Sequence, residues 1–198
     1  MKALIIVDVQ NDFLPGGALA VPRGDEIIPY INQIQSQYDL VVATQDWHPA
    51  YHGSFAANHA GTKPGEVISL NGLDQILWPT HCVQGSFGAE LAGDLDTKWI
   101  EKIFRKGEDS NIDSYSGLFD NGKKRSTGLG EYLKGKGVTE VEIVGLAADY
   151  CVKFTAIDAE EFGFQTTVLK EGTRAVNLSP GDFDSAINEL EKKGVLVK

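Results

Sequence analysis

Four places along the chain carry side chains suited to chemistry, and each follows a short apolar run of the kind that forms a strand. They hold Asp8, then Asp46 with His48, then Lys106, and finally Cys151. Open parallel sheets bind their ligands beyond the carboxyl ends of the strands, so strand ends that are distant in sequence meet at one edge. An acid, a pair of metal ligands, a base and a thiol at that edge predict a nucleophile beside a metal centre.

Cys151 is the candidate nucleophile. It stands at the start of a predicted helix, where backbone N–H groups and the helix dipole lower the pKa of a thiol and can bind an oxyanion. Asp8 is the candidate proton acceptor, and we expect burial to raise the pKa of its carboxyl group toward neutrality. Lys106 would balance these negative charges. Taken singly, each residue also has a structural explanation, as a buried cysteine, a turn cap and a surface charge.

Asp46 and His48 are two residues apart, so in an extended segment their side chains point the same way. The four histidines of the chain all fall between residues 48 and 81, and a third ligand could come from His52, His59 or His81. One carboxylate and two imidazoles, with water in the remaining positions, suit Zn²⁺, Fe²⁺ or Mn²⁺. This segment therefore predicts a site for one divalent metal.

The elements that would position these residues alternate between strand and helix. Residues 46–99 break the alternation, and we expect them to be a metal-binding loop insertion within a single domain of residues 1–198. The alternation predicts an α/β fold with a doubly wound, mostly parallel six-stranded sheet and helices on both faces. The predicted strands are Lys2–Asp8, Leu40–Thr44, Ile100–Arg105, Val141–Gly145, Thr166–Leu169 and Val195–Val197; the predicted helices are Asp25–Tyr38, Asp149–Phe162 and a last one with Ser179 as its N-cap.

The net charge and the first apolar run argue against some classes of protein. The chain has 198 residues, 42% of them hydrophobic, and a formal net charge of −10. This acidic balance argues against nucleic-acid binding, which needs clustered Lys and Arg. The first apolar run, Ala3 to Val7, is too short for an export signal or a membrane span. We expect a cytoplasmic protein with two free thiols, of which Cys82 is a packing residue.

Five segments are similar to motifs of one known family. They are MKALIIVDVQNDF at the start, TQDWHP at 44–49, WPTHC at 78–82, FRKG around Lys106 and GLAADYCV at 145–152. In this order, from Met1 to about Thr173, they resemble the nicotinamidases, a branch of the isochorismatase-like cysteine hydrolases. The VDxQNDF and GxAxxxCV segments mark the superfamily, whereas DWH together with WPxHC marks the branch.

The resemblance implies hydrolysis of nicotinamide to nicotinate and ammonia, through a cysteine thioester, in NAD salvage. It implies a triad of Cys151, Asp8 and Lys106. It also implies a cis peptide bond between Leu146 and Ala147, with the N–H groups of Ala147 and Cys151 forming the oxyanion hole.

For the substrate side, the resemblance implies that Asp46, His48 and His81 bind one divalent metal, Zn²⁺ first and Fe²⁺ or Mn²⁺ as alternatives. This metal would hold the pyridine nitrogen. The role of His52 stays open, because relatives differ in this loop. The aromatic positions that match the pyridine pocket are Phe13, Trp78 and Tyr115.

Two alternatives remain. A sister hydrolase could act on another small amide, a urea-type bond or a vinyl ether with the same thiol, although such relatives generally lack the metal set. A catalytically silent binding domain would be expected to have lost Cys151 or Lys106, and both are present. The sequence leaves open which metal is native, whether the chain forms a homo-oligomer, and whether pyrazinamide-like analogues are turned over.

Overall fold

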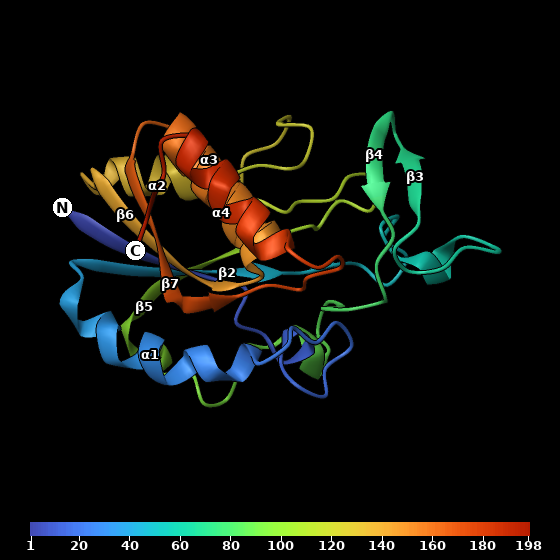
Figure 1. Cartoon of the computed structure of the whole chain (residues 1–198), viewed down its shortest axis with the longest axis horizontal. Helices are drawn as coiled ribbons and strands as arrows, with labels where there is room; N and C mark the ends of the chain where they lie inside the picture. Colours follow the sequence, from blue (N-terminus) through green and yellow to red (C-terminus); the bar gives the residue numbers. More distant parts are fainter.

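The computed structural model describes residues 1–198, and its centre is a six-stranded sheet in the order β5-β2-β1-β6-β7-β8 (Figure 1). Every neighbouring pair of these strands runs parallel. Each of the six predicted strand segments overlaps one of them, so the predicted sheet is confirmed. The strands are β1 (Lys2–Val7), β2 (Leu40–Asp46), β5 (Ile100–Lys106), β6 (Glu140–Leu146), β7 (Gln165–Arg174) and β8 (Leu196–Val197).

Helices cover both faces of the sheet, as expected for a doubly wound fold (Figure 1). Helix α1 (Ile27–Ile34) lies on one face, whereas α2 (Leu129–Gly135), α3 (Lys153–Glu161) and α4 (Asp182–Lys192) lie on the other. No helix combines the length and the apolar character that crossing a membrane requires.

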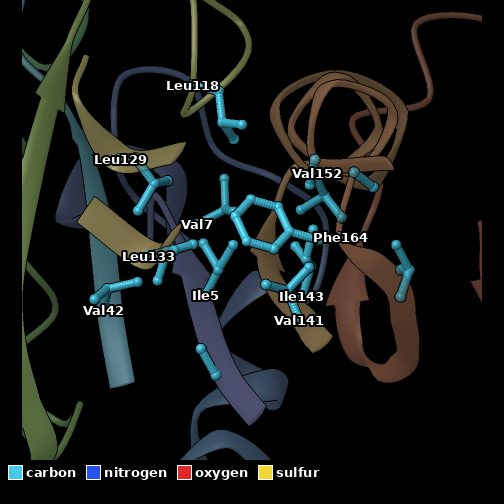
Figure 2. Close-up of a cluster of buried hydrophobic side chains, with 14 of the residues drawn as sticks. Ile5, Val7, Val42, Leu118, Leu129, Leu133, Val141, Ile143, Val152 and Phe164 are labelled. Carbon is cyan, nitrogen blue, oxygen red and sulfur yellow. The ribbon is translucent and has the colours of Figure 1, made fainter. Parts of the chain in front are cut away.

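Strand β1 is apolar at every position from Ala3 to Val7 because both of its faces are buried. Side chains alternate between the faces, so Ile5 and Val7 pack under α2 and α3 while Leu4 and Ile6 pack against α1. Figure 2 shows the first of these cores, in which Phe164 lies among side chains from β1, β6 and α2. The two cores hold β1 and β6 rigidly at the centre of the sheet.

Three local features differ from the prediction. Within residues 46–99, β3 (Val67–Leu70) and β4 (Leu73–Ile76) form an antiparallel hairpin that projects from the end of the sheet (Figure 1). Its Asn71-Gly72 turn has φ values of +51° and +84°, as a tight hairpin turn requires. Helix α2 was not predicted. Helix α4 begins at Asp182 rather than after Ser179, because Gly181 adopts a left-handed φ of +92°.

Candidate active site

The carboxyl ends of four adjacent strands meet at one edge of the sheet. The order β5-β2-β1-β6 places Lys106, Asp46, Asp8 and Leu146 on neighbouring strand ends. Cys151 follows β6 in a single π-helical turn, Ala148–Val152, that leads into α3. The convergence expected from the apolar runs is therefore present.

Lys106 lies at the centre of this cluster. Its Nζ is 2.9 Å from Oδ2 of Asp8, 3.4 Å from Sγ of Cys151 and 2.5 Å from Oδ1 of Asp46. The lysine is only 2% exposed, so the alternative that it is a surface charge is wrong. Burial opposes the charged ammonium, but the carboxylates of Asp46 and Asp8 outweigh burial and hold its pKa well above the usual value.

Asp8 is fully buried and has a left-handed φ of +50°. The hydroxyl of Thr44 on β2 donates a hydrogen bond to its Oδ1 at 2.6 Å, and Lys106 contacts its Oδ2. Burial raises the pKa of this carboxyl group, although Lys106 and Thr44 oppose the effect. The expected upward shift is confirmed, and such a carboxylate is suited to accept a proton near neutral pH.

The pKa expected for Cys151 was wrong. The start of a helix lowers the pKa of an exposed thiol, but burial raises the pKa of the Cys151 thiol well above its usual value. Lys106 lowers it, whereas Asp8 and Asp46 raise it because a second negative charge beside them is unfavourable. The resting cysteine is therefore a protonated thiol, and it must lose its proton to a neighbour before it can attack.

The peptide bond between Leu146 and Ala147 is cis. The carbonyl of Ala147 accepts hydrogen bonds from the N–H groups of Tyr150 and Val152, which closes the π-helical turn that carries Cys151. The N–H of Ala147 donates no hydrogen bond to any protein group. It is thus a free donor beside the thiol.

Asp46, His48 and His81 bring one possible ligand atom each to within 4.8 Å of the others. Oδ2 of Asp46 lies 3.5 Å from Nε2 of His48 and 3.7 Å from Nε2 of His81. Nδ1 of His48 bonds the carbonyl of Gly107, and Nδ1 of His81 bonds that of Pro79. Carbonyls only accept, so each Nδ1 carries the hydrogen and each Nε2 keeps a lone pair for a metal.

His52 differs from these two histidines. Its Nδ1 accepts the N–H of Ser54 at 3.1 Å, so in the neutral ring the hydrogen is on Nε2. That buried Nε2 has no hydrogen-bond partner, and burial lowers the pKa of His52 to about 4. The ring lies against His48 with centroids 4.4 Å apart. In this orientation the lone pair of His52 faces Ser54. His52 also belongs to a second group of possible ligands, with His48 and Asp113.

Two residues that the sequence analysis did not single out hold the candidate metal ligands in place. Oε1 of Gln10 accepts the N–H of Asp46 at 2.8 Å, and its Nε2 donates to the carbonyl of Asp46 at 2.9 Å. Oδ2 of Asp12 accepts the N–H of Cys82 at 2.7 Å, which fixes the turn after His81. The available signal was their position, in the polar segment directly after β1.

A small recess is lined by Asp46 and by Ala147, which follows β6. The three aromatic residues predicted for it, Phe13, Trp78 and Tyr115, all line it, together with His48 and His81. Tyr150 was not predicted and packs edge-on against Trp78, with centroids 4.9 Å apart. We call this cavity the aromatic recess. Its flat walls suit a planar aromatic molecule.

Comparison with known proteins agrees with this geometry. The isochorismatase domain matches residues 2–197. The nicotinamidase of Escherichia coli (strain K12) is 47% identical over 98% of this chain and 92% of its own length. The chain therefore belongs to the isochorismatase family. The resemblance to the nicotinamidase branch is confirmed by this relative.

Solved structures show the same relationship. A nicotinamidase/pyrazinamidase of Acinetobacter baumanii superposes with a TM-score of 0.96 at 45% identity, covering 99% of this chain and 94% of its own. The yeast nicotinamidase bound to the inhibitor nicotinaldehyde gives 0.94 at 37% identity, covering 100% and 99%. A pyrazinamidase of Pyrococcus horikoshii in complex with zinc gives 0.79 at 37% identity, covering 100% and 98%.

Proposed function

We propose that this chain is an amidase that hydrolyses nicotinamide to nicotinate and ammonia through a thioester on Cys151. The observation that carries the proposal is the position of the Lys106 ammonium, which contacts Asp8, Cys151 and Asp46, the last of which lines the aromatic recess. A buried thiol, a carboxylate and an ammonium in contact are the parts that covalent amide hydrolysis needs. The nicotinamidase relatives support the choice of substrate.

The first half of the reaction forms the thioester. Asp8 takes the proton from Sγ of Cys151, and the thiolate attacks the amide carbonyl carbon. The N–H groups of Ala147 and Cys151 bind the oxyanion that forms. Asp8 then gives its proton to the amide nitrogen, the C–N bond breaks, and ammonia leaves.

The second half regenerates the cysteine. Asp8 takes a proton from water while the resulting hydroxide attacks the thioester carbonyl. The C–S bond breaks, Asp8 returns the proton to the sulfur, and nicotinic acid leaves and ionises to nicotinate in water. Throughout, Lys106 offsets the negative charge that moves between Asp8 and the thiol, in a pocket too dry for water to do so.

The residues around Asp46 fit one divalent metal, because a carboxylate oxygen and two imidazole lone pairs converge there. We propose that Asp46, His48 and His81 hold Zn²⁺, with Fe²⁺ or Mn²⁺ as ions that the same ligands accept. The zinc complex of the Pyrococcus horikoshii pyrazinamidase supports this choice. When bound, the metal supplies a Lewis acid for the pyridine nitrogen. Phe13, Trp78 and Tyr115 hold the ring faces.

The proposed roles of these residues bear on the domain organisation of the chain, its cellular setting and a second substrate. We propose that residues 1–198 form one domain in which residues 46–99 are an insertion that supplies metal ligands and the wall at Trp78. NAD salvage in the cytoplasm is the setting that fits the proposed reaction. Pyrazinamide, which keeps the ring nitrogen and the carboxamide, is expected to enter the same recess.

The test is ammonia release from nicotinamide, pyrazinamide, benzamide and a panel of non-aromatic amides and ureides. We expect turnover of the two ring-nitrogen amides and little turnover of benzamide, which has no ring nitrogen. Preference for a non-aromatic amide or a ureide would instead support a sister cysteine hydrolase. No turnover of any compound by the metal-loaded protein would support a silent binding domain.

A further inference from the structure

Gln75 on β4 is buried although it lies in a hairpin that projects from the sheet. Its Nε2 is 2.8 Å from the carbonyl of Ile76, 3.0 Å from Oδ2 of Asp113 and 3.2 Å from the hydroxyl of Tyr115. A carbonyl and a carboxylate both accept hydrogen bonds, so the atom that faces them is the amide nitrogen and the side-chain orientation is determined.

The Tyr115 hydroxyl has a second neighbour of the same kind. Nε1 of Trp78 lies 3.2 Å from it. An indole N–H and a carboxamide N–H can only donate, so the phenol oxygen is the acceptor toward both Trp78 and Gln75, and the two hydrogens of the Gln75 amide are shared among its three acceptors. The phenol hydrogen then points elsewhere, and it has no acceptor among the protein groups.

The two donors fix the hydroxyl of a residue that lines the aromatic recess. Tyr115 and Trp78 both line the recess, and the edge of Tyr150 packs against both rings. On the other side, Asp113 is held because its Oδ1 accepts the N–H of Ser114 at 2.8 Å. The backbone N–H of Ser114 thus holds Asp113, Asp113 contacts the amide of Gln75, and Gln75 contacts the Tyr115 hydroxyl.

We propose that Gln75 is a positioning residue for substrate binding. It holds the Tyr115 hydroxyl so that its hydrogen is available to an acceptor atom of the heteroaromatic amide in the recess. It thereby couples the β3–β4 hairpin to the pocket wall. This inference rests on the proposed function, because its readout is nicotinamide turnover, and it assigns Gln75 no contact with the reacting atoms.

The experiment compares Gln75→Met, which keeps the length and volume of the side chain, with Gln75→Ala and Tyr115→Phe. Losing one hydrogen bond is expected to raise KM for nicotinamide about fivefold, with kcat within about twofold of wild type. The double variant Gln75→Met/Tyr115→Phe should be no worse than the weaker-binding single variant, because both changes remove the same interaction. Asp74→Asn is the matched control, since Asp74 is the exposed neighbour on the same strand.

The outcomes separate this inference from the proposed function. A wild-type protein that turns over nicotinamide while Gln75→Met keeps its KM would overturn the inference alone. Effects of Gln75→Met and Tyr115→Phe that multiply in the double variant would overturn it too, since Gln75 would then not act through Tyr115. A fall in kcat at constant KM in Gln75→Met would also overturn the inference, because substrate binding would then be unaffected. A metal-loaded wild type that leaves nicotinamide intact would overturn the proposed function and this inference with it.

Discussion

Lys106 bonds one oxygen of Asp46 at 2.5 Å, while the other oxygen of that carboxylate faces the imidazoles of His48 and His81. The same ammonium contacts Asp8 and the thiol of Cys151. One lysine therefore joins the residues proposed to make the thioester to the residues proposed to hold the metal. Burial opposes the charged form of Lys106, but the two carboxylates outweigh it and keep the ammonium charged. Because the ammonium is buried, its charge acts strongly on its neighbours.

The two cysteines should differ sharply in function. Cys151→Ala is expected to lower kcat by about 10⁴-fold or more, since a coupled triad loses its nucleophile. Cys82→Ala should retain most activity, because the nearest hydrogen-bond partner of its sulfur is the carbonyl of Gly88, 3.9 Å away. Ammonia release and metal content are measured for both variants. The reverse pattern of activities would show that the nucleophile is misassigned.

Removal of the imidazoles tests the metal set. The double variant His48→Ala/His81→Ala should lose its divalent metal and bind nicotinamide more weakly, because two of the three ligands are gone. Elemental analysis of the purified protein, alongside calorimetric titration with nicotinamide, measures both effects. His59→Ala is the control, since the His59 ring bonds the carbonyl of Gly53 and lies outside the set. Unchanged metal content in the double variant would rule out these ligands.

Lys106→Met should make the Cys151 thiol harder to ionise. The ammonium lowers the pKa of this thiol, so its removal raises the pKa further and leaves two carboxylates near the sulfur uncompensated. We expect a lower rate at neutral pH and alkylation of Cys151 by iodoacetamide that shifts to higher pH. Lys106→Arg should rescue only in part, because a planar guanidinium does not fit where a compact ammonium sat.

The control for this prediction is Lys102→Met, an exposed lysine on the same strand. Its alkylation curve should coincide with that of wild type. If the Lys106→Met curve coincides as well, the ammonium does not influence the thiol.

Glu142 on β6 should make stability depend on acid. Burial raises its pKa, but Lys2 at 2.6 Å and the Tyr38 hydroxyl outweigh burial and hold the pKa below its usual value of 4.5. A folded-state pKa below the unfolded one contributes stability that is present above the unfolded pKa and is lost as pH falls through the folded pKa. We therefore expect Glu142→Gln to destabilise the protein at pH 7 and to weaken the loss of stability on acidification.

Urea unfolding at pH 7 and at about pH 3 measures this difference in unfolding free energy. Glu140→Gln serves as the control, because Glu140 is exposed two residues earlier on β6 and forms no ion pair. An equal loss of stability on acidification in wild type and Glu142→Gln would show that the contacts with Lys2 and Tyr38 contribute nothing measurable.

The sheet was predictable because its strands carry a local signal. A strand buried on both faces reads as a nearly continuous apolar run, as β1 does from Ala3 to Val7 and β6 does from Ile143 to Leu146, so both can be recognised without knowing what covers them. Parallel order then brings their carboxyl ends together, which is why Asp8 and Asp46 could be placed at one edge. The β3–β4 hairpin has a weaker signal, since each strand has only four residues; exposed and half-buried residues alternate in β3, whereas in β4 the one buried residue is the polar Gln75.

The resemblance to a known family identified the candidate site residues. The burial and the pKa of each residue, however, depend on groups that surround it in the folded chain. Nothing local to Lys106 says that it is buried, because its partners Asp8 and Asp46 come from other strands. The pKa of Cys151 follows the same rule: its helix start was visible in the sequence, whereas the burial that outweighs the helix start was not.

The residue types and their order along the chain by themselves determined the fold class, and they predicted Cys151 as the nucleophile and a metal site at Asp46 and His48, while the third ligand was predicted from the family resemblance. Only the tertiary structure decided which groups are dry, which nitrogen of each histidine is free, and that Gln10, Asp12 and Gln75 hold the site in place. The physical reason is that apolar periodicity is a property of consecutive residues. Burial, hydrogen-bond satisfaction and charge pairing are instead properties of atoms that are brought together from distant segments.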